Sequence, residues 1–243
     1  MVRNRSQPVS NSNRVPKNWP RDVAYLAVPS YSKAVTTELL QSLNVPPSTS
    51  INPLSSTLLK SPSPIIHITP IENNAHPANG QCGLFAAQHL PPSSFITLYL
   101  GRVHTSAACD TDPASNYDLC LDRELGIGID ATHCGNEARF INDYRGIKAA
   151  GPNAEFRDVW VDVGKGKLER RIGVFVLSAG RSGKRAKGIS KGEEVLVSYG
   201  KGFWGERRRK GESGGGEEAL VSWDTGNGNI EEVLGPPTGA LEM

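Results

Sequence analysis

The sequence predicts a mostly β protein built of several small sheets, with short helices and disordered termini. Short runs rich in β-branched and aromatic residues recur between glycine- and proline-bearing turns, which is typical of strands joined by tight connections. No segment between these runs is long enough to form the helical crossovers that a parallel α/β sheet requires. The predicted strands cover residues 65–68, 95–100, 126–130, 159–163 and 172–177.

Composition limits the partners of the chain. Only 37% of the 243 residues are hydrophobic, and the chain has 17 Pro and 26 Gly, so we expect part of it to be unstructured. A net charge of +2 gives no global attraction to nucleic acid or to a membrane surface, and we expect neither as a direct partner. No apolar run approaches the roughly 18 residues of a membrane span. The basic start of the chain leads into no apolar segment, so we expect a protein that is not secreted and is nuclear or cytoplasmic.

Changes in composition along the sequence divide the chain into three parts. Residues 1–62 read as an N-terminal arm that ends in a proline- and serine-rich linker. Within this arm, residues 32–43 have apolar positions at helical spacing, and Ser32 is the expected N-cap. Residues 63–205 hold the predicted β domain, and we expect residues 206–243, which are charged and glycine-rich, to form a flexible tail.

The cysteines do not predict a metal site. Cys82, Cys109, Cys120 and Cys134 form no C-x-x-C pair, and no histidine lies at zinc-finger spacing from them. We therefore expect four reduced thiols and no bound metal. The basic stretch 181–191 is typical of a solvated loop; the alternative is a docking face for an acidic partner or nucleic acid.

Several short motifs, in a fixed order over about residues 65–204, resemble those of the SET domain, the fold of protein-lysine methyltransferases. Arg139-Phe140-Ile141-Asn142 and the stretch from Gly192 to Gly200 resemble its two closing motifs. The other matching segments are Gly83 to Ala86, Tyr99 to Gly101, Ser115 to Leu119, Ile129 to Ala131, and Pro152-Asn153. The resemblance implies a SET-like fold with a threaded C-terminal segment, of a fungal type that lacks cysteine-rich zinc flanks.

The resemblance further implies an S-adenosylmethionine-dependent protein-lysine N-methyltransferase, with S-adenosyl-L-methionine as cofactor and a histone or non-histone protein as substrate. The reaction needs no side-chain base. A lysine amine has an unperturbed pKa of about 10.4, and a sulfonium about 4 Å away repels its ammonium form by roughly 4 kcal/mol at an effective dielectric of about 20. The alternatives are a catalytically inactive SET-like scaffold that binds a protein partner, and an unrelated β-rich adaptor.

Site residues follow from the matching positions. The resemblance makes Tyr199 and Tyr117 catalytic, with the hydroxyl of Tyr199 near the transferring methyl, and it places Tyr117 and Val197 along the substrate channel. The alternative for Tyr199 is a packed aromatic whose hydroxyl bonds to backbone; for Arg139, Phe203 and Trp204 it is a structural role. The implied cofactor-binding residues are Gln81, Cys82, Gly83, Arg139, Asn142, Asp143, Tyr199, Phe203 and Trp204.

The chain departs from the family pattern at three places. The opening motif is Gln81-Cys82-Gly83 instead of Gly-x-Gly, and the asparagine motif continues as Asp143-Tyr144-Arg145 instead of His-x-Cys. Residues 147–151 form an apparent insertion before Pro152. These departures leave open the choice between enzyme and scaffold. Val197 is smaller than the aromatic residue usual at its position, which favours a capacity for di- or trimethylation.

Overall fold

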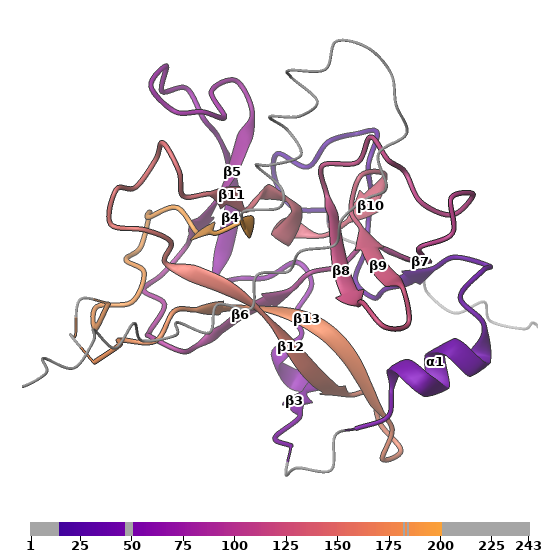
Figure 1. The fold of residues 1–243 in the computed structure, drawn as a ribbon. Helices are drawn as coiled ribbons and strands as arrows, with labels where there is room; N and C mark the ends of the chain where they lie inside the picture. The colour runs from indigo at the N-terminus through magenta and orange to yellow at the C-terminus, as the bar shows by residue number, and fades with distance from the viewer. Residues whose placement is uncertain (1–14, 47–50, 182, 184, 201–243) are drawn as a thin grey trace, which may run out of the picture. The chain divides into compact units, whose positions relative to one another are not determined.

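The fold is known from a computed structural model that describes residues 15–46, 51–181, 183 and 185–200 (Figure 1). The predictions for the extreme N-terminus, for the tail 206–243 and for Phe203 and Trp204 lie outside these residues. The described chain contains one α-helix and two short 3-10 helices. These are α1 (Thr37–Leu43), η1 (Ser56–Leu58) and η2 (Glu137–Phe140).

The strands are short and numerous, and the prediction of a mostly β fold with several small sheets is confirmed. In chain order they are β1 (Ala24–Tyr25), β2 (Ser30–Tyr31), β3 (Leu54–Ser55), β4 (Ile66–Pro70), β5 (Cys82–Ala86), β6 (Phe95–Leu98), β7 (Arg102–Thr105), β8 (Asp118–Asp122), β9 (Ile127–Asp130), β10 (Cys134–Gly135), β11 (Asn142–Asp143), β12 (Ala154–Asp162), β13 (Leu168–Val176) and β14 (Leu196–Val197).

These strands form two four-stranded sheets, ordered β3-β12-β13-β6 and β2-β7-β9-β8, and the pairs β1-β10, β4-β5 and β11-β14. The antiparallel hairpin of β12 and β13 is the longest element (Figure 1) and pairs in register from Ala154 with Val176 to Asp162 with Leu168. It begins five residues before the predicted strand. The extension is polar: Glu155 and Arg157 lie half-buried on it and pair with each other.

The stretch before residue 63 contributes strands to the folded unit. β1, β2 and β3 each pair in parallel, over two residues, with β10, β7 and β12. Such short parallel pairs need no helical crossover, because their partners lie far along the chain. The boundary at residue 63 stays a prediction. The pairing leads us to propose that the folded unit begins well before it.

The helix prediction was wrong about where the helix begins. α1 starts at Thr37, and Thr36, in extended backbone conformation, is its N-cap: the Thr36 hydroxyl accepts a hydrogen bond from the Leu39 N–H at 3.3 Å. Ser32 lies outside the helix: its hydroxyl accepts a hydrogen bond from the Ala34 N–H at 3.2 Å and donates to the buried Asp110 carboxylate at 2.5 Å. A local spacing rule does not reveal this partner, which is 78 residues away.

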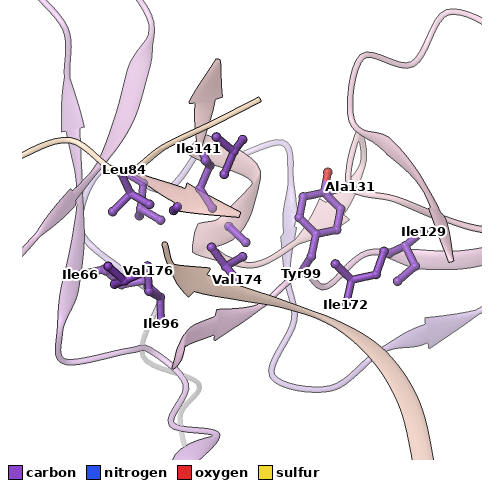
Figure 2. Close-up of a cluster of buried hydrophobic side chains, with 14 of the residues drawn as sticks. Ile66, Leu84, Ile96, Tyr99, Ile129, Ala131, Ile141, Ile172, Val174 and Val176 are labelled. Carbon is purple, nitrogen blue, oxygen red and sulfur yellow. The ribbon is translucent and has the colours of Figure 1, made fainter. Parts of the chain in front are cut away.

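The core joins strands from separate sheets. Buried side chains from β4, β5, β6, β9, β13 and β14 form one apolar cluster (Figure 2). Leu84 of β5 and Val197 of β14 are both completely buried, and Ile141, which follows η2, is 3% exposed. The segments that carry the family-like motifs are therefore fixed to one another by apolar packing.

Candidate active site

The candidate site is built around the segment 193–199, which runs between β5 and β11. On one side, the Ala86 N–H donates to Glu193 O at 3.0 Å and the Val195 N–H to Leu84 O at 2.8 Å. On the other side, β14 pairs in parallel with β11, with Asn142 opposite Leu196. The opening glycine motif and the asparagine motif thus lie on either side of one strand-like segment.

Asn153 secures this segment through its side chain. Its amide donates to Glu194 O at 2.8 Å, and its amide oxygen accepts from the Leu196 N–H at 2.8 Å. The backbone N–H of Asn153 also donates to Leu196 O at 3.0 Å. The residue is 6% exposed, so these hydrogen bonds are protected from water.

Tyr199 is held at both its backbone and its hydroxyl. The hydroxyl donates to Ile141 O at 2.6 Å, and the backbone N–H donates to the Asp143 carboxylate at 2.7 Å. Because the hydroxyl donates its proton to a carbonyl, its oxygen can meet a further polar group only as an acceptor. The tyrosine of the last motif is therefore oriented by the asparagine motif.

Asp143 has a clear local role where the family pattern has histidine. It is 6% exposed, and besides the Tyr199 N–H it accepts from the Arg145 N–H at 2.8 Å and from the Arg145 guanidinium at 2.7 Å. A charged partner and two backbone donors satisfy a buried carboxylate. All these contacts are within the protein, so a cofactor contact by Asp143 remains a prediction.

Glu194 connects the opening motif to the asparagine motif. Its carboxylate accepts from the Asn142 amide at 2.8 Å and contacts the His76 ring at 3.1 Å. It also lies against Gly83, where a Cβ would come within 2.6 Å of Glu194 Oε1. Glycine at this position is what allows the backbone of β5 to approach the carboxylate.

Tyr117 is contacted by Tyr99 at its backbone carbonyl and by Arg139 at its ring. The buried Tyr99 donates its hydroxyl to Tyr117 O at 2.6 Å. Burial, followed by the charges of Tyr199, Asp130 and Asp118, raises the pKa of Tyr99 well above its usual value, so that hydroxyl stays protonated. The Arg139 guanidinium lies 4.4 Å from the centre of the Tyr117 ring.

Arg139 and its helix make several contacts within the protein, and the cofactor contact of Arg139 remains a prediction. Its guanidinium donates to Ala131 O at 3.0 Å, and η2 is held by Tyr25, whose hydroxyl lies 3.2 Å from both carboxylate oxygens of the buried Glu137. Trp19 packs edge-on against Phe140 at a centroid distance of 5.6 Å. Residues from the predicted arm therefore support the helix that leads into the asparagine motif.

The remaining predicted residues divide between core and surface. Val197 is completely buried in the apolar cluster, so its side chain is closed off by neighbours. Gln81 is exposed, and Cys82 is half-buried, which raises the pKa of its thiol. Their roles in a channel or cofactor site remain predictions.

The strand that follows Tyr117 is fixed by a buried histidine. His104 of β7 lies opposite Gly128 of β9, and a Cβ on that glycine would be 2.7 Å from the ring. The ring thereby reaches Asp118 of β8, with Nε2 at 2.9 Å from the carboxylate and Nδ1 at 2.9 Å from Thr105 O. Both nitrogens face acceptors, so this geometry selects the doubly protonated ring.

We expect stability to depend on pH through His104. Burial alone would lower its pKa, but the hydrogen bond and charge of Asp118, the Thr105 carbonyl and Asp130 raise it above the usual value. The stabilisation is then complete below the unfolded-state pKa and is lost as the pH rises through the folded-state pKa, by up to about 1.4 kcal/mol per pH unit.

Urea unfolding of wild type and His104→Gln from pH 5 to 9 measures this pH dependence. The difference between them should shrink with rising pH, whereas the exposed His133→Gln should track wild type. A difference constant across this range would contradict the assignment.

The described ranges offer neither a metal cluster nor a membrane-spanning helix. No three His, Cys, Asp or Glu side chains come together there as a metal site would require. No helix among the described residues has the length and apolar character needed to cross a membrane. The expectation of no metal remains a prediction.

Comparison with known proteins identifies the domain that holds the candidate site. Residues 81–200 match the family model of the SET domain, and the chain contains a SET domain over these residues. Its relatives include histone-lysine N-methyltransferase ASHH3 of Arabidopsis thaliana, 30% identical over 125 residues that make up 48% of this chain and 29% of the relative. The putative histone-lysine N-methyltransferase ASHH4 of the same plant is 29% identical over 124 residues, 48% of this chain and 30% of the relative. The chain spans less than a third of the length of either.

Solved structures also resemble this chain. A crystal structure of the Chaetomium thermophilum polycomb repressive complex 2 is 24% identical, with a TM-score of 0.40, and the match covers 56% of this chain and 15% of that one. KRYPTONITE in complex with mCHH DNA, an H3(1-15) peptide and SAH is 22% identical, with a TM-score of 0.38, over 56% of this chain and 23% of that one.

Sequence reasoning missed three residues of the site. Glu194 stands within a recognised motif but has no predicted role, and Tyr99 is predicted only as part of a strand. His76 carries no local signal, because it becomes a neighbour of Glu194 only through a fold that brings together residues 118 positions apart. A buried acid such as Glu194 requires partners, and that requirement is the signal that could have prompted a search for them.

Proposed function

We propose that this protein is an S-adenosylmethionine-dependent protein-lysine N-methyltransferase. The observation that carries the proposal is the fixation of Tyr199 by the asparagine motif, through Ile141 O and the Asp143 carboxylate. The SET domain match and the names of the curated relatives support it. The substrate would be a protein lysine, on a histone or another protein, and the compartment would be nuclear or cytoplasmic.

The groups around Glu194 suit the two cationic groups at the methionine end of this cofactor, which carries an ammonium and a sulfonium besides its carboxylate. The Glu194 carboxylate is held by the amide of Asn142 and the ring of His76. The Asn142 amide uses its nitrogen for its hydrogen bonds to Glu194 and to Cys82 O, so among the described residues its carbonyl oxygen remains available to accept. Acceptor atoms close to a carboxylate attract a cationic ligand.

Each residue would have a separate task. The cofactor, when bound, would supply an electrophilic methyl group. Gly83, Asn142 and Glu194 would hold its methionine end. The Tyr199 oxygen, whose proton is directed at Ile141 O, would accept a hydrogen bond from the lysine amine and so orient it. Tyr117 would line the lysine channel. Val197 is enclosed by neighbouring side chains. Its effect on the number of methyl groups transferred to one lysine has to be measured from the reaction products.

Asn142→Ala should weaken cofactor binding. Truncation removes the amide that bonds to Glu194 and leaves that carboxylate with one fewer donor, at a cost of roughly 1–3 kcal/mol. We expect the dissociation constant for S-adenosylmethionine to rise about tenfold or more. Titration calorimetry of the wild type and the variant measures this.

The control is Asn79→Ala, which removes an exposed amide–amide hydrogen bond to Asn74 at 3.1 Å. It should bind like wild type. Equal affinity of wild type and a folded Asn142→Ala would count against the proposed site. Binding by the wild type without methyl transfer to any protein or peptide would favour the alternative of an inactive scaffold.

A further inference from the structure

His76 lies outside the matched SET segment 81–200, but its side chain contacts Glu194 within that segment. It belongs to the loop between β4 and β5, and its side chain is 8% exposed. Its Nε2 lies 3.1 Å from Glu194 Oε2, while Glu194 Oε1 accepts from Asn142 at 2.8 Å. The Glu194 carboxylate thus links His76, which precedes the matched SET segment, to Asn142 of the asparagine motif.

The hydrogen bonds of the ring fix its tautomer. Nδ1 lies 3.0 Å from the backbone nitrogen of Ala78, which can only donate, so Nδ1 must accept. Nε2 therefore carries the proton and donates it to Glu194. A neutral ring that donates through Nε2 satisfies both contacts, and it leaves the negative charge of Glu194 uncancelled.

The loop holds His76 in place through its backbone. The His76 N–H donates to Asn73 O at 2.9 Å, and His76 O accepts from the Asn79 N–H at 2.9 Å. Both ends of the loop are closed by a pair of backbone hydrogen bonds, from Ile71 N–H to Gln81 O at 2.8 Å and from Gly80 N–H to Ile71 O at 2.9 Å. The ring is therefore presented to Glu194 from an ordered scaffold, as an orienting group must be.

We propose that His76 is a positioning residue for the cofactor: it orients the Glu194 carboxylate and, through it, the Asn142 amide toward a cationic methyl donor. The inference rests on the proposed function. A neutral donor suits this task better than Lys or Arg, because a cation there would cancel the negative charge that attracts an ammonium or sulfonium. Without His76, Glu194 would lose one of its two side-chain donors, and its carboxylate would be free to turn away from Asn142.

Calorimetric titration with S-adenosylmethionine tests the role. His76→Phe keeps a ring of similar size but removes the donor, and we expect its dissociation constant to rise about tenfold. His76→Gln retains an N–H donor and should stay within about threefold of wild type. Asn79→Ala perturbs the same loop without touching Glu194 and should bind like wild type. Thermal melting confirms that each variant is folded, and His76→Ala replaces His76→Phe if that variant is not.

A double-mutant cycle separates positioning from a general structural effect. If His76 acts through Glu194 and Asn142, His76→Phe should add little to the binding loss of Asn142→Ala. Full additivity, or wild-type affinity of His76→Phe, would overturn this inference while leaving the proposed function intact. Failure of the wild type to bind the cofactor would overturn both.

Discussion

Tyr199→Phe should lower the rate of methyl transfer by about 10²–10³, by analogy with the loss of a single positioned hydroxyl or amide donor in other active sites. The structure gives this expectation a physical basis. The hydroxyl donates to Ile141 O at 2.6 Å, and this hydrogen bond sets the orientation of its oxygen. Phenylalanine keeps the ring and its packing but removes the oxygen that would orient the amine.

The same substitution should leave cofactor binding nearly unchanged, because the backbone N–H of Tyr199 still donates to Asp143. The lost hydrogen bond should cost about 0.5–1.5 kcal/mol of unfolding free energy. Single-turnover kinetics, calorimetry and urea unfolding measure the three effects separately. A Tyr199→Phe protein with wild-type turnover would remove Tyr199 from the catalytic assignment.

Asn153→Ala should destabilise the fold more than any of the other substitutions, with a loss of about 3 kcal/mol or more in the free energy of unfolding. The buried side chain donates to Glu194 O and accepts from the Leu196 N–H. Its removal leaves a carbonyl and an N–H without those partners, and each unpaired buried group costs about 1–3 kcal/mol. Because both groups belong to the segment 193–199, that segment should loosen, and the dissociation constant for the cofactor should rise as well.

Urea unfolding measures the stability loss, with Asn79→Ala as the matched control for deleting an asparagine amide at an exposed site. That control should change the free energy of unfolding by no more than about 0.5 kcal/mol. A loss below about 1 kcal/mol in Asn153→Ala would mean that the β5 and β11 hydrogen bonds hold the segment without the asparagine.

The β character and the SET-like motif order could be predicted because both are local. The β-branched runs that became β4, β6 and β9 need only their own residues to indicate strands. β7, by contrast, was not predicted. Its sequence, Arg102 to Thr105, is short and half polar, and it becomes a strand because β9 and β2 pair on either side of it.

The rest of the site could not be predicted because it depends on long-range pairs. Ser32 has the features of an N-cap, but its hydroxyl bonds to Asp110, and His76 resembles an ordinary loop residue until Glu194 lies beside it. Asp143 was predicted as a departure from a motif and as a cofactor contact, whereas the structure shows that its carboxylate accepts a hydrogen bond from the Tyr199 N–H. In each case, the partner of a polar side chain determines its role, and the partner is distant in sequence.

Methyl transfer by the purified chain tests the central claim most directly. The chain is incubated with S-adenosylmethionine and a library of protein and peptide substrates, with Tyr199→Phe in parallel, and products are followed by mass spectrometry over time. Our account predicts methylated lysine from wild type and a yield at least about 10²-fold lower from the variant at early times. Methyl-lysine formed equally by both proteins, or by neither although wild type binds the cofactor, would contradict it.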